Sequence, residues 1–320
     1  MTRFINLIHF VGPETDRLPA VPAFFVLALA LALSLGGCSR PAPRTMEDDL
    51  TGGRISIACA TEANGILRRQ IEEFQTLYPK ASFDVRETSS RDAVGDLFGG
   101  RADLAVITRD LDVEERAAAV RGGLKLEGFR FACDAVAIVV REDNPVENLA
   151  LDDLRAIYEG GIAEWPALGG TAGRIVPVVQ PPASDITGYF VQQVMGGGAL
   201  RASALYADGD SAVIRAVRAN RFAIGYASLS AIGPGVRALR IASLKALPYW
   251  KPDAQSAYEG HYPLTRYFSY YLRESGPRLA HGVVTFGTSL EGQTLVKDGG
   301  LVPTSVPVRF VRRSPMLSTH

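Results

Sequence analysis

Residues 134–140 read DAVAIVV, which is the strongest strand signal in the chain because β-branched residues make up most of this apolar run. Shorter runs of the same kind occur on both sides of it. We expect further strands at 54–60, 82–86, 103–107, 175–179, 223–227 and 262–272. The fold is therefore expected to be built around β-sheet.

Helical patterns separate these strands. Apolar residues recur at helical spacing at Leu67, Ile71, Phe74 and Tyr78, and Pro79 ends that segment. We expect further helices at 92–98, 113–121, 151–159, 188–195, 278–286 and 290–297, and one more that Asp210 caps. Strands that alternate with helices predict an α/β architecture with mainly parallel sheets.

Composition excludes several classes of protein. The chain has 320 residues, enough for two ordinary domains, and 47% of them are hydrophobic, enough for a sizeable core. Lys and Arg number 34 against 34 Asp and Glu, which argues against nucleic acid as a partner. Three cysteines and four histidines are too few for a disulfide scaffold or a multi-Cys or His-rich metal site. We therefore expect no metal and no cofactor.

The N-terminal segment indicates export. Residues 24–35 (FFVLALALALSL) are too short to span a bilayer and fit the core of a signal peptide. The following Leu35-Gly36-Gly37-Cys38 resembles a bacterial lipobox, which predicts a signal peptide over 1–37 and a lipid on the Cys38 thiol. The alternative is an ordinary secretory signal with an incidental cysteine. A lipidated chain would face the periplasm or the cell surface while anchored to a membrane.

The segment after Cys38 is rich in Pro, Gly and charged residues, so we interpret 38–53 as a flexible tether. No later stretch of the sequence is apolar for long enough to span a membrane. Residues 306–320 are expected to form a C-terminal tail. Whether the lipid lies in the inner or the outer membrane stays open.

Several motifs follow one another in the order known from one family. They are GRAD at 100–103, TRDL at 108–111, the segment from Asp134 to Leu149, the segment from Leu154 to Gly170, AIGYAS at 223–228, YPLTR at 262–266 and EGQ at 291–293. In this order they resemble the PstS family, the phosphate-binding proteins of bacterial ABC importers. The resemblance covers roughly residues 54–304.

The resemblance implies a type 2 periplasmic-binding-protein fold. Two Rossmann-like α/β lobes would be joined by hinge strands at 134–140 and 262–272. Lobe 1 would comprise 54–140 and 263–305, and lobe 2 would comprise 141–262. A small solute would lie between the lobes and be captured when they close by hinge bending.

Three loops before helices would bind the oxyanion, because helix N-termini present free N–H groups and the positive end of a dipole. In the first loop Thr61 matches a threonine of the family, but Glu62 replaces the threonine whose hydroxyl is a ligand. A carboxylate there would repel phosphate. The alternative is that Glu62 turns outward as an ordinary first-turn acid.

The second loop reads Ser89-Ser90-Arg91 where the family has Gly-Ser-Gly. Ser90 matches the ligand serine. Arg91 would supply a cation, or else be a solvated arginine paired with Asp92. The hydroxyl of Thr108 falls where relatives carry a serine or an aspartate at the cleft.

The third loop departs furthest from the family pattern. Ser184 is the only residue of this loop that matches the pattern. Gln180 stands in place of the arginine, and Asp185 stands in place of a glycine. The family threonine is missing at position 186, and Thr187 would substitute for it. The lost charge-assisted contact is worth about 1.5–3 kcal/mol, or roughly tenfold to a hundredfold in affinity. The fold prediction survives these changes, whereas the identity of the solute becomes open.

The first functional hypothesis is therefore a monomeric lipoprotein that captures phosphate or a related small solute and delivers it to an ABC permease and its ATPase. The second is a sensory or assembly module that uses the same fold with a degenerate or different ligand site. An enzyme such as a phosphate-ester hydrolase ranks last, because the sequence offers no assembled nucleophile–base pair. Cys59 and Cys133 are expected to be small buried residues, the alternative being a disulfide between them.

Overall fold

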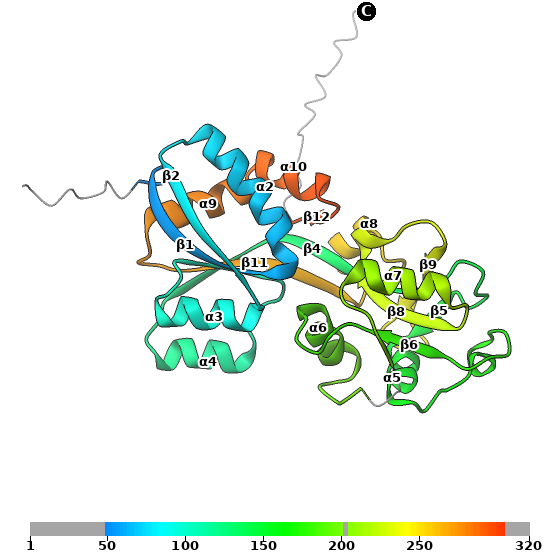
Figure 1. Cartoon of the computed structure of the whole chain (residues 1–320). Helices are drawn as coiled ribbons and strands as arrows, with labels where there is room; N and C mark the ends of the chain where they lie inside the picture. Colours follow the sequence, from blue (N-terminus) through cyan, green and yellow to red (C-terminus); the bar gives the residue numbers. More distant parts are fainter. Residues whose placement is uncertain (1–48, 201–203, 305–320) are drawn as a thin grey trace, which may run out of the picture. The chain divides into compact units, whose positions relative to one another are not determined.

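The computed structural model describes residues 49–200 and 204–304 (Figure 1). The predicted signal peptide at 1–37, the lipidation site Cys38 and the tail at 306–320 lie outside the described residues. In the part of the chain that is described, no helix has the length and apolar character needed to cross a membrane.

The first flank of the main sheet consists of three parallel strands. β1 (Gly53–Ala60) pairs with β2 (Ala81–Thr88) on one side and with β3 (Leu104–Ile107) on the other. Alternate residues of β1 face opposite layers: Ile55 and Ile57 pack in the core beneath α2 (Thr61–Leu77), and Ala58 packs in the core beneath α3 (Ser90–Gly99). Helices thus cover both faces, as a buried parallel sheet requires.

Two long antiparallel strands form the centre of the sheet. β4 (Leu126–Arg141) pairs with β11 (Thr265–Arg273) along most of its length, and β11 also pairs with β3. The register of β4 and β11 shifts at a bulge between Phe268 and Ser269. The predicted strand 134–140 is the second half of β4, whose first half was missed because Gly and charged residues interrupt its apolar pattern.

The second flank continues from the far half of β4. β4 pairs antiparallel with β8 (Ala223–Ser228), and β8, β6 (Val176–Val179) and β7 (Leu205–Tyr206) follow in parallel. The full order is β2-β1-β3-β11-β4-β8-β6-β7. Parallel pairing therefore holds within each flank, as predicted, and antiparallel pairing joins the flanks.

The remaining elements belong to this sheet or lie around it. They are α4 (Val113–Arg121), β5 (Asn148–Ala150), α5 (Leu151–Glu159), α6 (Asp185–Val194), α7 (Asp210–Ala219), β9 (Val236–Ala238), β10 (Arg240–Ala242), α8 (Ala254–Tyr258), α9 (Arg278–Thr288), α10 (Leu290–Asp298) and β12 (Val302–Pro303), with short 3₁₀ turns at Trp165–Leu168 and Leu229–Ala231. Two of these strands, β9 and β12, pair antiparallel with β4 in the same sheet, and the other elements lie around it. Figure 1 shows α5, α6 and α7 around the strands of the second flank. The predicted helices and strands are confirmed in type and order.

Other differences lie at the ends of helices. α3 begins at Ser90 and α6 at Asp185, each two or three residues before the predicted start, because the hydroxyls of Ser89 and Ser184 cap them. The expectation that Asp210 caps α7 is wrong: Gly209 is the N-cap, and Asp210 is the first helical residue. Its carboxylate instead accepts hydrogen bonds from the Gln180 side chain and from the Ser228 N–H at the end of β8.

The end of the segment interpreted as a tether is packed on the fold. Gly53 is already part of β1, where it pairs with Ala81. A Cβ atom at Gly282 of α9 would lie 1.8 Å from the carbonyl oxygen of Leu50, so the chain passes directly over that helix. The folded part therefore begins a few residues before the predicted boundary at 54.

Cys59 and Cys133 are both buried free thiols, so the interpretation as small buried residues is confirmed and the disulfide alternative is not. Burial raises the pKa of Cys59 to about 12 and that of Cys133 to about 11, with nearby carboxylates adding to the shift. Both thiols are therefore protonated at neutral pH.

We predict that neither thiol reacts with iodoacetamide in the folded protein. At pH 8 roughly one molecule in a thousand or fewer carries either thiolate, and the thiolate is the reactive form. Peptide mapping by mass spectrometry should find both cysteines unmodified in buffer and both modified in denaturant. Modification of either under native conditions would contradict the burial described here.

Candidate functional site

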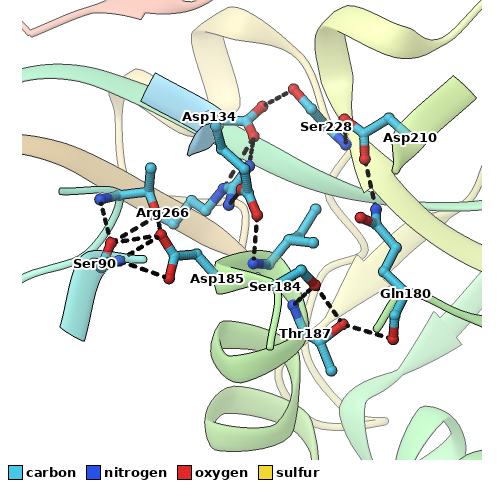
Figure 2. Close-up of polar contacts among 12 residues, drawn as sticks. Ser90, Asp134, Gln180, Ser184, Asp185, Thr187, Asp210, Ser228 and Arg266 are labelled. Carbon is cyan, nitrogen blue, oxygen red and sulfur yellow. Dashed lines mark hydrogen bonds and ion pairs between the residues drawn. The ribbon is translucent and has the colours of Figure 1, made fainter. Parts of the chain in front are cut away.

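The carboxylate of Asp185 lies at the N-terminus of α3, although it belongs to α6. One carboxylate oxygen, Oδ2, accepts a hydrogen bond from Ser90 Oγ at 2.6 Å and another from Thr108 Oγ1 at 3.1 Å. The Ser90 N–H donates to both carboxylate oxygens at 3.2 and 3.3 Å (Figure 2). A residue of the second flank thus occupies a position at which a helix of the first flank presents its donors.

A reciprocal contact runs in the other direction. Glu62, in the first turn of α2, accepts a hydrogen bond from the Ile186 N–H at the N-terminus of α6, at 3.0 Å. The other oxygen of Glu62 forms an ion pair with Arg266. Glu62 therefore turns inward, and the alternative of an outward-facing first-turn acid is wrong.

Arg266 is buried in the middle of the sheet, with 3% of its surface exposed. Its Nε and Nη2 donate to Asp134 Oδ2 at 3.1 and 2.9 Å, and Asp134 is 1% exposed. Burial alone would lower the pKa of Arg266, but the attraction of Glu62 and Asp134 outweighs it and raises that pKa. Burial raises the pKa of Asp134, while Arg266 and the Ser228 hydroxyl oppose that shift.

Gln180 is also buried, and its side-chain amide donates to Asp210 Oδ1 at 2.7 Å. The second oxygen of Asp210 accepts from the Ser228 N–H at 3.2 Å, and the Ser228 hydroxyl donates to Asp134 at 2.9 Å. Burial raises the pKa of Asp210, with the Gln180 hydrogen bond opposing the shift. The side-chain amide of Gln180 is therefore a hydrogen-bond donor to the Asp210 carboxylate.

Ser184 and Thr187 organise the N-terminus of α6. Ser184 Oγ accepts from the Thr187 N–H as the helix cap. Thr187 is buried, with its hydroxyl 2.8 Å from the Tyr226 hydroxyl and 3.2 Å from the Gln180 carbonyl oxygen. Both residues lie close to Asp185 and give the loop its shape, and Thr187 faces into the second flank.

A pocket of about 500 Å³ opens beside this network. The residues of the network that line it are Glu62, Gln180, Asp210, Ser228 and Arg266, and Arg69 and Asp208 are also part of its wall. Three carboxylates and two guanidinium groups therefore border one cavity. In the described ranges, no group of three or more His, Cys, Asp or Glu side chains is arranged to hold a metal ion.

The structure brings together some of the predicted site residues and separates others. One connected region contains Ser90, Gln180, Ser184, Asp185 and Thr187 (Figure 2). Hydrogen bonds join Thr108 and Glu62 to the same region. Thr61 is exposed, and its hydroxyl donates to the Thr88 carbonyl. Ser89 caps α3 from outside the cluster. Arg91 is exposed, and the described residues include no ion pair between it and Asp92.

Three acidic or basic residues at the centre of the network were missed as site residues. Arg266 and Asp134 were read only as parts of motifs, and Asp210 only as a helix cap. The available signal was the placement of Arg266 and Asp134 inside strands that are otherwise apolar, since a charge in a buried strand needs a partner. Asp134 and Arg266 stand directly opposite each other in the β4–β11 register.

Comparisons with known proteins identify the family of this chain. A family model described as a PBP superfamily domain matches residues 45–291. Phosphate-binding protein PstS of Pseudomonas aeruginosa is 24% identical over 312 residues, covering 92% of this chain and 97% of that protein. Phosphate-binding protein PstS of Bacillus subtilis is 24% identical, covering 81% of this chain and 83% of the relative.

Solved structures share the fold. An ABC-type phosphate transport receptor from Vibrio cholerae superposes with a TM-score of 0.69 at 24% identity, over 78% of this chain and 99% of that one. A phosphate ABC transporter substrate-binding protein from Clostridium perfringens, described as putative and solved with phosphate bound, gives a TM-score of 0.65 at 24% identity, over 79% of this chain and 100% of that one. The predicted type 2 architecture is confirmed.

We predict that Arg266→Met destabilises the fold by about 3–5 kcal/mol, because it leaves the buried Asp134 carboxylate without its cation. Urea denaturation should show a lower midpoint. Arg141→Met, which breaks an exposed ion pair with Asp143, is the matched control and should change stability little.

Adding Asp134→Asn to Arg266→Met should recover part of the loss, since Asp134 is then no longer an unpaired buried charge. Equal stability of Arg266→Met and the native protein would contradict the role assigned to this pair.

Proposed function

This chain belongs to the PBP superfamily, and on that premise we propose that it is an extracytoplasmic solute-binding protein that captures phosphate or a related oxyanion for an ABC importer. The named relatives that align over most of its length are phosphate-binding proteins. Their coverage of both chains supports a shared role for the whole folded part. The protein would bind and release its solute without changing it chemically.

The observation that carries this proposal is the set of donors around the Asp185 carboxylate. A carboxylate is itself an oxyanion, and here it accepts hydrogen bonds from a helix N-terminal N–H and from two hydroxyls. Donors of the same kind suit a phosphate or sulfate oxygen equally well. Ser90 and Thr108 are therefore the residues that we assign to solute binding, with Ser184 and the start of α6 on the opposite side.

Capture requires the two flanks to move relative to each other. We propose lobes that comprise 54–140 with 263–305 and 141–262, connected through β4 and β11. Bending of these two strands would open and close the space between the N-termini of α3 and α6. The contacts of Asp185 and Glu62 across that space correspond to the closed arrangement.

A second function is favoured by one specific observation. The anion position at α3 is occupied by a side chain of the protein itself, Asp185. In agreement with this, Gln180 stands in place of the arginine of the family pattern, and its amide bonds to Asp210. A sensory or assembly module with a degenerate site would look the same. The two functions differ in whether any solute binds and in whether the partner is a permease or a signalling protein.

The proposed location rests on the N-terminal sequence. The apolar segment at 24–35 and the following Leu35-Gly36-Gly37-Cys38 support export and lipidation of Cys38. A lipid anchor with the short segment before β1 would hold the solute-binding part close to a membrane-embedded importer.

We predict that phosphate raises the melting temperature of the purified protein in a saturable manner. A solute at about 100 times its Kd stabilises the folded state by about 2.7 kcal/mol. Hydrogen exchange should slow in residues 89–93 at the start of α3 when phosphate is present. Residues 289–293 at the start of α10 are the internal control, because Ser289 caps that helix in the same way outside the site.

The outcomes of this titration separate the two functions. A shift with sulfate, molybdate, a phosphonate or a small amine in place of phosphate would retain solute capture and change the solute. No shift with any of them would contradict the importer function and favour the sensory or assembly module.

We also predict that Cys38→Ser abolishes lipid attachment, since the Cys38 thiol is the proposed acceptor. Metabolic labelling with a palmitate analogue should label the native protein and leave Cys38→Ser unlabelled. Cys59→Ser is the control and should be labelled normally, because Cys59 is buried in the folded part. Labelling of Cys38→Ser would contradict lipidation at Cys38. The N-terminal segment would then be interpreted as an ordinary secretory signal.

A further inference from the structure

We propose that Asp185 and Glu62 form a reciprocal carboxylate latch that competes with the solute, so that an oxyanion binds only by displacing Asp185 from α3. This inference rests on the proposed function and names the residues that set the affinity of that same site. The latch consists of the Asp185 carboxylate at the N-terminus of α3 and the Glu62 carboxylate at the N-terminus of α6.

The first argument is the reciprocity of the two contacts. Asp185 reaches from the first turn of α6 to the first residue of α3, and Glu62 reaches from the first turn of α2 to the Ile186 N–H of α6. Each flank therefore supplies a carboxylate to a helix N-terminus of the other. Such contacts favour the state in which the flanks are close together even when no solute is bound.

The second argument is that Asp185 and an oxyanion exclude each other. The Ser90 hydroxyl has one proton, and it is donated to Asp185 over 2.6 Å. The Thr108 hydroxyl also has one proton, donated to the same carboxylate oxygen. Neither hydroxyl has a second proton for a solute oxygen. A phosphate that used these donors would have to take them from Asp185.

The third argument is electrostatic. Asp134 and Glu62 pair with the guanidinium of Arg266, and Asp185 precedes Ile186, whose N–H donates to Glu62. A phosphate placed beside Asp185 would therefore add negative charge next to one carboxylate and close to a second. Like charges at such short range repel strongly in a partly buried site. Displacement of Asp185 removes one of these charges as the solute enters.

The latch also implies selectivity. A solute with a single carboxylate offers α3 no more than Asp185 already offers. A tetrahedral oxyanion carries more acceptor oxygens and can bond to α3 and α6 together, so it can outcompete the internal group. The site would therefore respond to tetrahedral oxyanions and ignore monocarboxylates.

Removal of Asp185 is feasible without loss of α6, because Ser184 caps this helix. We expect Asp185→Ala to bind phosphate about tenfold or more tightly than the native protein, measured by isothermal titration calorimetry. Asp185→Asn is the conservative variant and should show a smaller gain in the same direction. Asp152→Ala removes an exposed first-turn acid from α5 and is the matched control, expected to leave phosphate affinity unchanged.

A double-mutant cycle distinguishes competition from a general loss of negative charge. In the native background Ser90 gives up its hydrogen bond to Asp185 when it forms one to phosphate, so the two contributions nearly cancel. Ser90→Ala should therefore change phosphate affinity by less than about threefold. In the Asp185→Ala background the same substitution should weaken binding by about tenfold, because phosphate is then the sole anionic partner. Equal effects in both backgrounds would overturn the proposal.

A measurement without solute tests the other half of the latch. Small-angle X-ray scattering should give a larger radius of gyration for Asp185→Ala combined with Glu62→Gln than for the native protein, and the Asp152→Ala control should match the native value. Larger dimensions with no phosphate binding by any variant would retain the latch and reject the phosphate function. Native phosphate binding that Asp185→Ala leaves unchanged or weakens, with unchanged dimensions, would reject the latch and retain the function.

Discussion

The buried ion pair between Arg266 and Asp134 is the constraint on which the rest of the site depends. The two residues stand opposite each other on the central strands β4 and β11, and both are almost completely buried. If β4 and β11 paired one residue out of register, Asp134 and Arg266 would no longer face each other, and two buried charges would lack partners. The free-energy cost of those unpaired charges exceeds the cost of rearranged backbone hydrogen bonds. The pair therefore fixes the register of the strands that connect the two flanks.

From this pair a continuous polar network extends into both flanks. Glu62 connects Arg266 to α2, and the Ser228 hydroxyl connects Asp134 to the end of β8. The backbone of Ser228 then bonds to Asp210, which holds Gln180. Because each of these buried groups has a partner, the network is rigid where it is complete. Side chains that were treated singly in the sequence act here as one unit.

The sequence analysis succeeded where local patterns decide structure. Apolar runs and helical spacing located the elements in the correct order, because those patterns reflect burial against the sheet. It placed the starts of α3 and α6 too late because serine caps precede the apolar residues. It named Ser90, Thr108 and Asp185 from the family motifs, and the structure brings these three together. The direction of Glu62 depended on Arg266, which is 204 residues further along the chain. Partners so far apart leave no local pattern.

The β-bulge at Phe268 and Ser269 has a geometric consequence. Phe268 pairs with Ala132 and Ser269 pairs with Arg130, so Phe131 of β4 is the extra residue. A bulge bends the strand that carries it and increases the local right-handed twist. Ser269 also pairs with Ile107 of β3, so this twist arises inside the first flank. It therefore affects the direction in which β4 leaves the first flank to pair with β8.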